Sequence, residues 1–146
     1  MENRLGYPVE ITKDDNGTWL VTSRDLPELV TYGETQEEAL SHAVEALELV
    51  LSIYIDKGML VPKPSPARQR PIVQPSLSAR MKLILYIELK EAKMRKLMLA
   101  KKMGIKPQQI NRLFDLKHKS RIDQIESAFH ALNLLPTLDV EKNLRA

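Results

Sequence analysis

The chain has 146 residues, of which 43% are hydrophobic and none is cysteine. This composition allows one or two packed domains, excludes disulfides and thiolate-bound metals, and fits a reducing compartment. The chain begins without a basic region followed by an apolar run, and no stretch approaches the roughly 18 apolar residues of a membrane span. We therefore expect a cytoplasmic protein that has no membrane segment.

The net charge of +3 hides a division between the two halves of the chain. Residues 1–66 carry five Lys and Arg against twelve Asp and Glu, whereas residues 67–146 carry seventeen against seven. The resulting net charges of −7 and +10 indicate two different partners. The basic half has the charge of a surface that follows nucleic acid phosphates, and the acidic half suits a basic protein.

The first part of the chain has the pattern of a three-stranded antiparallel meander. Apolar residues alternate with polar ones over residues 7–11 and again over residues 18–23. Between them, Asn16-Gly17 is a strong hairpin signal. After a Leu-Pro bend, residues 29–32 predict a third short strand.

A long helix is expected next. Thr35 is a suitable N-cap, and Glu38 stands three residues later, as in a capping box. Gly58 ends the helix about twenty residues on. The helix has an apolar stripe at helical spacing, which consists of Leu40, Ala43, Val44, Leu47, Leu51 and Tyr54. We expect this stripe to pack on one face of the sheet.

Residues 61–75 differ from the rest because they hold five of the nine prolines. Proline fixes φ and removes a hydrogen-bond donor, so we expect an extended connector. Ile72 and Val73 are suited to an edge strand of the first sheet, where proline is tolerated. We place a domain boundary near Pro75, which divides the chain into residues 1–75 and 76–146.

The second region reads as all-helical. Ser76 or Ser78 caps its first helix, whose inward residues are predicted to be Leu77, Met81, Ile84, Leu85 and Leu89. Its last helix is predicted to begin with a capping box, Ser120 to Asp123, and to run to about Leu132. That helix is expected to bury Ile122, Ile125, Phe129 and Leu132. Residues 137–140 favour a short strand that pairs with its copy across a dimer axis.

Between these helices, residues 94–116 have the spacing of a helix-turn-helix. Ala100 is small enough for two helices to cross closely, and Gly104 tolerates the positive φ of the turn. Pro107 suits a first helical turn. Leu99, Met103, Ile105, Ile110 and Leu113 complete a small core. We predict a recognition helix over about residues 107–114.

The outer face of that helix supplies the candidate binding residues. Side chains of the kinds that read base edges are Gln108, Gln109, Asn111 and Arg112. Candidate phosphate contacts are Lys101, Lys117, His118, Lys119 and Ser120. The spacing alone also fits an αα-hairpin with a solvated polar face, and the charge of the basic half favours DNA binding.

Several short runs in order resemble the N-terminal domain of HicB antitoxins. They are Tyr7-Pro8-Val9, Gly17-Thr18-Trp19, Asp25-Leu26-Pro27-Glu28, Gly33-Glu34-Thr35 and Glu38-Ala39. The C-terminal part resembles the phage-repressor-type helix-turn-helix of one HicB subfamily. In three places the chain departs from the family pattern: Arg95 lacks a capping side chain, Lys106 replaces a common Ser, and Glu28 replaces a common Gly.

The resemblance implies an α+β fold and a type II toxin–antitoxin role. The N-terminal part would be a partial ribonuclease-H-like domain, a small antiparallel sheet with one long helix and no working active site. It would bind and inhibit HicA, an mRNA-cleaving ribonuclease toxin. The C-terminal part would dimerise, bind operator DNA and repress the operon, with higher assemblies formed together with the toxin.

Two alternatives stay open: a nuclease or other catalytic domain tethered to DNA, and a stand-alone transcriptional regulator. The acidic residues Asp14, Asp15, Asp25 and Glu28 do not have the pattern of a two-metal nuclease site, because none is placed on adjacent strand centres facing one side. The three aspartates are instead typical of turns. His42, His118 and His130 lie on different elements, without partners at ligand spacing. We therefore expect neither a metal nor another cofactor, and no enzyme.

Overall fold

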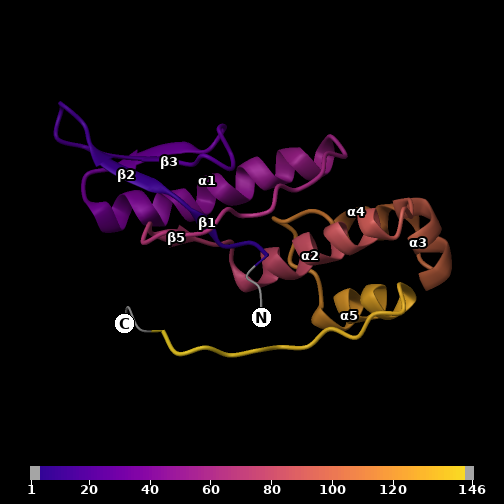
Figure 1. Ribbon diagram of the computed structural model, residues 1–146. Helices are drawn as coiled ribbons and strands as arrows, with labels where there is room; N and C mark the ends of the chain where they lie inside the picture. Colours follow the sequence, from indigo (N-terminus) through magenta and orange to yellow (C-terminus); the bar gives the residue numbers. More distant parts are fainter. Residues whose placement is uncertain (1–3, 144–146) are drawn as a thin grey trace.

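The computed structural model describes residues 4–143, so the outer ends of the two predicted regions lie outside the described residues. Within this range the fold is a mixed α+β arrangement, as predicted (Figure 1). The strands are β1 (Tyr7–Pro8), β2 (Glu10–Lys13), β3 (Trp19–Thr22), β4 (Val30–Gly33) and β5 (Ile72–Val73). The helices are α1 (Gln36–Asp56), α2 (Leu77–Glu91), α3 (Lys96–Met103), α4 (Pro107–Leu113) and α5 (Ile122–Ala131).

The predicted meander is present as the antiparallel sheet β2-β3-β4. The hairpin between β2 and β3 turns where Asn16-Gly17 predicted it, and the Gly17 N–H donates to the Asp14 carbonyl at 3.0 Å. The first predicted strand is split, because the chain changes partners at Val9. Tyr7 and Pro8 pair with β5, and only the residues after Val9 pair with β3.

Helix α1 packs on one face of this sheet (Figure 1). The Thr35 side chain accepts a hydrogen bond from the Glu38 N–H at 3.1 Å, which confirms the predicted N-cap. Gly33, at the end of β4, lets the chain pass close to the first turn of α1. A Cβ at this position would lie 2.5 Å from the Ala39 nitrogen. All six residues of the predicted stripe are buried or partly buried against the core.

The proline-rich segment is extended apart from a turn over residues 67–70, and hydrogen bonds attach it to β1 and to the loop before β4. Tyr7 donates a hydrogen bond to the Pro62 carbonyl at 2.7 Å, and Ser65 donates one from its hydroxyl to Asp25 at 3.0 Å. Ile72 and Val73 form the predicted strand, β5, but it does not join the sheet β2-β3-β4 as its edge. It pairs instead with β1 in a separate two-stranded antiparallel sheet, because the chain changes partners at Val9. The segment therefore forms part of the packed structure rather than a free connector.

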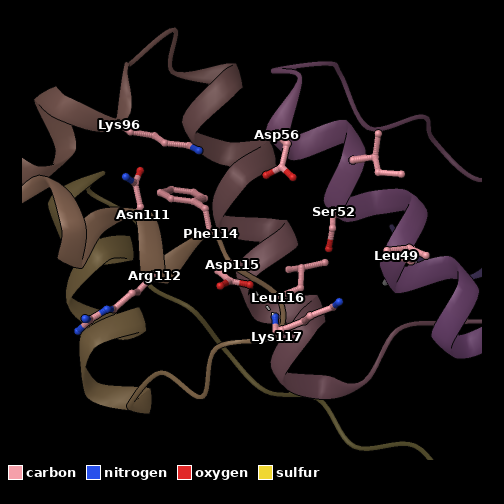
Figure 2. Close-up of a pocket in the computed structure, with 11 residues that line it drawn as sticks. Leu49, Ser52, Asp56, Lys96, Asn111, Arg112, Phe114, Asp115, Leu116 and Lys117 are labelled. Carbon is pink, nitrogen blue, oxygen red and sulfur yellow. Dashed lines mark hydrogen bonds between the residues drawn. The ribbon is translucent and has the colours of Figure 1, made fainter.

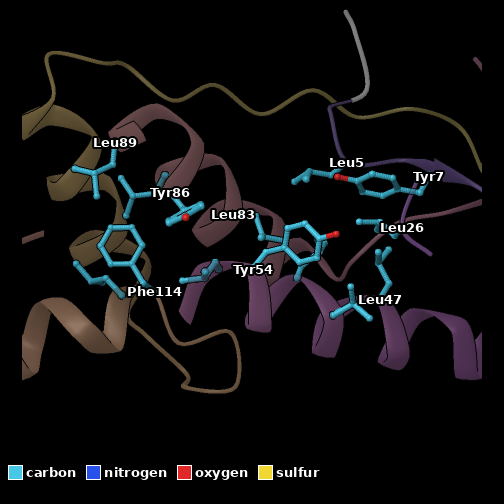
Figure 3. Close-up of a cluster of buried hydrophobic side chains, with 14 of the residues drawn as sticks. Leu5, Tyr7, Leu26, Leu47, Tyr54, Leu83, Tyr86, Leu89 and Phe114 are labelled. Carbon is cyan, nitrogen blue, oxygen red and sulfur yellow. The ribbon is translucent and has the colours of Figure 1, made fainter. Parts of the chain in front are cut away.

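A single hydrophobic cluster runs through both predicted regions (Figure 3). Tyr54 and Leu47 of α1 contribute to the same buried cluster as Leu83 and Tyr86 of α2. Phe114 extends it, with its ring centroid 6.3 Å from that of Tyr86 in an edge-on arrangement. The boundary near Pro75 stays a prediction, and the core crosses it without a break.

Helices α2 and α5 differ from prediction in which residues they bury. Ser76 caps α2 as expected, but Leu77 is 48% exposed. Helix α5 begins at Ile122 with Arg121 as its N-cap residue, and Ile122 is 70% exposed. The predicted cap residue Ser120 instead donates its hydroxyl proton to the Arg112 carbonyl at 3.3 Å. Residues 137–140 form no strand.

Candidate nucleic-acid interface

The corner between α3 and α4 depends on Gly104. Its φ of +67° lies in the left-handed region, which disfavours residues with a Cβ. The N–H groups of Ile105 and Gly104 donate to the carbonyls of Ala100 and Lys101 at 3.0 and 3.2 Å. These two bonds form a Schellman motif and satisfy carbonyls at the end of α3. The predicted turn residue is thus confirmed.

Apolar contacts hold α4 against α3 as the spacing predicted. Leu99, Ala100, Ile110 and Leu113 are buried, with exposed fractions of 3% or less. Met103 and Ile105 pack against this cluster and are partly buried. The burial of Ala100 agrees with its predicted place at a close approach of the two helices.

The first turn of α4 uses Gln109 as well as Pro107. Pro107 is the first helical residue, and Lys106 precedes it without a side-chain capping bond. The Gln109 side-chain oxygen instead accepts a hydrogen bond from the Lys106 N–H at 2.8 Å. A bidentate contact to adenine needs both the oxygen and the nitrogen of the amide. Gln109 can therefore make this contact only if its oxygen leaves the helix cap.

The other three predicted base-reading residues project outward. Helical residues follow one another at 100° intervals, so the direction opposite buried Ile110 and Leu113 falls among Gln108, Asn111 and Arg112. All three are exposed. Gln109 instead lies at the flank of α4, where it lines a small hollow that also includes Gln124 and Ser127 of α5. Three of the four predicted base-reading residues therefore lie on the face of α4 opposite its buried side, and Gln109 lies beside that face.

The predicted phosphate contacts lie on both sides of α4. Lys101 is exposed in the last turn of α3, and Lys117, His118 and Lys119 are exposed in the loop after α4. Ser120 is half-buried, and its hydroxyl lies 3.2 Å from His118 Nδ1 besides donating to the Arg112 carbonyl. A phosphate contact from this hydroxyl would require breaking that internal bond.

Lys82 of α2 binds the backbone of this loop from the core side. Lys82 was not identified from the sequence as part of the site. Its side chain is buried, and Nζ donates to the carbonyls of Arg112, Asp115 and His118 at 2.9, 2.7 and 2.6 Å. Burial lowers the pKa of Lys82, and the charge of Asp115 opposes that shift. The signal in the sequence was a lone cation on the buried stripe of an amphipathic helix.

A second lysine lies at a groove between α1 and α4 (Figure 2). The Lys96 ammonium lies 5.1 Å from the centroid of the Phe114 ring, and burial lowers its pKa while Asp56 opposes this. The groove has a volume of about 470 Å³. Its walls are Leu49, Ser52, Ile53 and Asp56 of α1 and, opposite, Lys96, Asn111, Arg112, Phe114, Asp115, Leu116 and Lys117.

The acidic residues that a nuclease site would use have structural roles. Asp25 accepts hydrogen bonds from the Ser65 N–H and hydroxyl, and the Glu28 carboxylate accepts one from Tyr54 at 3.0 Å. Residues 4–143 contain no group of three or more His, Cys, Asp or Glu that could hold a metal ion. No helix in the same range is long and apolar enough to cross a membrane.

Comparison with known proteins decides the family. The family model described as "HicB_like antitoxin of bacterial toxin-antitoxin system" matches residues 6–84, more than half of the chain. The chain belongs to this HicB-like antitoxin family. It is 33% identical over 137 residues to Antitoxin HicB 1 of Photorhabdus laumondii subsp. laumondii, covering 94% of this chain and 88% of that relative. It is 34% identical over 129 residues to Antitoxin HicB of Escherichia coli (strain K12), covering 88% and 94%.

Membership in the HicB-like family confirms the resemblance to HicB antitoxins and gives the chain an antitoxin role, which is regulatory and not catalytic; the helix-turn-helix subfamily stays a prediction. The family model ends within α2, but the similarity to the relatives goes further. A match over 137 of the 146 residues leaves too few residues uncovered to omit α3 and α4. The candidate nucleic-acid interface therefore lies within the part of the chain that resembles curated HicB antitoxins.

Proposed function

We propose that this antitoxin neutralises a HicA-like mRNA-cleaving ribonuclease toxin and represses its own operon by binding operator DNA. The N-terminal part, residues 1–75, would bind the toxin, and the C-terminal part, residues 76–146, would bind DNA and dimerise. The two activities would reside in surfaces of opposite charge on one shared core. The observation that carries the DNA half is the exposed face of α4 beside a cationic loop.

The toxin-binding part rests on family membership and charge. The family model covers all five strands, α1 and about half of α2. A small antiparallel sheet with one long helix on one face is what a partial ribonuclease-H-like domain would look like. The net charge of −7 over residues 1–66 favours a basic partner, and a protein that holds RNA is expected to be basic.

The DNA-binding part rests on the corner of α3 and α4, which we interpret as a helix-turn-helix. Gln108, Asn111 and Arg112 would face base edges in the major groove, with Gln109 joining them if its oxygen leaves the cap. Lys101, Lys117, His118, Lys119 and Ser120 would contact phosphates. Only α4, at seven residues, would enter the groove, so a homodimer on two half-sites about 34 Å apart is the expected arrangement.

The toxin-binding proposal is tested by coexpressing the full chain with the small basic open reading frame that adjoins its gene. The full chain is used because the core joins both regions. Restored growth together with copurification of the two proteins is the expected result. If the neighbouring protein is toxic and the chain neither binds it nor restores growth, the proposed toxin partner is wrong.

The DNA-binding proposal is tested separately by footprinting the purified chain on the DNA upstream of its own gene. Protection of two half-sites about one helical turn apart is expected from a dimeric helix-turn-helix. A footprint with another spacing would contradict the proposed dimer geometry. No protection at low salt would contradict operator binding while leaving toxin binding unaffected.

A further inference from the structure

The buried ammonium of Lys82 lies directly beneath the end of α4 and the loop that follows it. We propose that Lys82 is a positioning residue for DNA binding: it holds the loop of residues 114–120 in the conformation that presents Lys117, His118 and Lys119 to phosphates. This inference rests on the proposed DNA-binding function. Lys82 itself would not touch DNA, because its side chain is only 1% exposed.

The contacts of Lys82 define a three-point clamp on the backbone. Its Nζ donates to the carbonyls of Arg112 in the last turn of α4, Asp115 two residues past the helix end, and His118 in the loop. The three distances, 2.9, 2.7 and 2.6 Å, are those of charge-assisted hydrogen bonds. An ammonium has three donors, and all three are used here.

The end of α4 has no glycine cap, and its Arg112 carbonyl accepts long bonds, both 3.3 Å, from the Asp115 N–H and the Ser120 hydroxyl besides the shorter one from Lys82. The last carbonyls of a helix have no partner within the helix, and a left-handed glycine often brings backbone N–H groups to them. Phe114 ends α4 with a φ of −108°, so this backbone solution is not used. A cation at this end also interacts favourably with the helix dipole. Lys82 adds the charge and the shortest of these hydrogen bonds to the Arg112 carbonyl, at 2.9 Å.

The clamp reaches the loop residues that carry the phosphate-contacting charges. The His118 N–H donates to the Asp115 carbonyl and the Ser120 N–H donates to the His118 carbonyl, both at 3.1 Å. Both acceptor carbonyls are also held by Lys82. Three of the nine predicted DNA contacts, Lys117, His118 and Lys119, therefore lie on backbone that the clamp fixes.

The clamp is itself fixed, because α2 is anchored at both ends. At its start, the Ser76 N–H and hydroxyl donate to Glu48 of α1 at 3.0 and 2.7 Å. Near its end, Leu85 and Leu89 are buried in the core. A loop held in its binding conformation before DNA arrives loses less entropy on binding. Without the ammonium, the same charges would still be present but no longer ordered.

The test compares Lys82→Met with Lys90→Met, which removes one charge from the same helix but no carbonyl clamp. Binding of each full-length variant to a random-sequence duplex is measured over a range of salt concentrations. We expect Lys82→Met to lower the slope of log K against log salt by about 2. This is the value for loss of two phosphate contacts, those of Lys117 and Lys119, at about 0.9 each. We expect Lys90→Met to keep the slope of the unmodified chain.

Hydrogen exchange without DNA gives a second, independent reading. The His118 and Ser120 amides should exchange faster in Lys82→Met than in the unmodified chain, whereas amides in the β2-β3-β4 sheet should not. In Lys82→Gln, which keeps two N–H donors without the charge, these two amides should exchange at rates between those of the unmodified chain and Lys82→Met. Lys82→Gln serves in place of Lys82→Met if the latter does not fold.

Each contrary result has its own meaning. An unchanged salt slope, or an equal loss in Lys90→Met, would overturn the positioning role, because bulk charge would then explain the effect. Unchanged exchange at His118 and Ser120 would overturn the clamp itself. If the unmodified chain binds duplex DNA without salt dependence, the DNA-binding proposal fails, whatever exchange shows for Lys82.

Discussion

The hydroxyl of Tyr86 in α2 donates a hydrogen bond of 2.7 Å to the carbonyl of Met59, just beyond the end of α1. This bond joins the two regions that charge and composition separate. The Tyr86 ring lies in the hydrophobic cluster that both regions share, with the Lys90 ammonium 5.6 Å from its centroid. The acidic and basic parts of the chain are therefore expected to unfold together.

We predict one unfolding transition for the whole chain. Trp19 is the one tryptophan and lies in the sheet, so its fluorescence follows the N-terminal part, while the helical circular dichroism signal includes α2–α5. The two urea denaturation curves should coincide. Tyr86→Phe should lower the free energy of unfolding by about 1 kcal/mol, through loss of one buried hydrogen bond, and keep the curves coincident.

A matched control is Tyr32→Phe, which removes a hydroxyl from a side chain that is 62% exposed. Its free energy of unfolding should stay within about 0.5 kcal/mol of the unmodified chain. Fluorescence and circular dichroism curves with different midpoints would show two independent domains and contradict the shared core as the basis of cooperativity.

Gly104→Ala should destabilise the chain by about 1–2 kcal/mol, because alanine disfavours the left-handed backbone required at this corner. The reason is conformational and not steric, since a Cβ at Gly104 would meet no atom within 4 Å. Gly104→Asn should lose less, because asparagine tolerates this conformation. Thermal unfolding of both variants is the measurement, and equal losses would contradict the conformational explanation.

Gln108→Ala and Gln109→Ala should separate DNA reading from helix capping. Gln109→Ala removes the acceptor of the Lys106 N–H and should lower the free energy of unfolding by about 0.5–1 kcal/mol. Gln108→Ala should leave stability unchanged and reduce discrimination at one operator position by about 1–3 kcal/mol. Urea denaturation and binding to single-base operator variants measure these effects. If Gln109→Ala loses discrimination between operator variants while its free energy of unfolding is unchanged, the Gln109 amide leaves the helix cap when DNA binds.

Lys119→Ala should weaken binding to operator and random duplexes by the same factor, because a phosphate contact carries no sequence information. The slope of log K against log salt should fall by about 0.9. Lys63→Ala, an exposed lysine in the proline-rich segment, is the matched control and should leave both quantities unchanged. A change in the ratio of operator to random binding would place Lys119 against a base instead.

Stability should fall as the pH rises above 10, partly because of Tyr7. Burial, with Asp25 and Tyr54 nearby, raises the pKa of Tyr7 from its ordinary value of 10.0. The unfolded chain then releases this proton at a lower pH than the folded chain, so the Tyr7 contribution is complete below pH 10 and declines above it. One such group changes the free energy of unfolding by at most about 1.4 kcal/mol per pH unit.

Tyr7→Phe tests this assignment. At pH 8 it should lower stability by about 1 kcal/mol, through loss of the hydrogen bond to the Pro62 carbonyl. Between pH 10 and 11 its stability should decline less steeply than that of the unmodified chain, as measured by urea denaturation. An equally steep decline in both proteins would show that other groups cause the alkaline loss.

Features that depend on residues close in sequence were predictable. Thr35 and Ser76 cap their helices, and Gly104 and Pro107 shape the corner between α3 and α4, because each acts on a backbone a few residues away. The apolar stripe of α1 followed from helical spacing in the same way. The antitoxin family was also readable from short runs in order along the chain, and the comparisons confirm it.

Features that depend on distant residues were not predictable. Ser120 had the local sequence of a cap, but its hydroxyl bonds to the Arg112 carbonyl eight residues away. The first strand divides at Val9 because β5, more than sixty residues later, competes with β3 as a partner. Periodicity also misplaced Leu77 and Ile122, since it gives a helix an apolar side but not where neighbouring elements end.

The sequence by itself determined the family, the order of the elements, the charge division and the outward-facing chemistry of α4. Only the tertiary structure decided that the two halves share one core. It also decided that the Gln109 side chain, predicted to contact a DNA base, caps the start of α4, and that Lys82 lies under the loop of residues 114–120. The physical reason is that a local pattern fixes a backbone conformation, whereas burial and hydrogen-bond partners depend on which distant segments pack together.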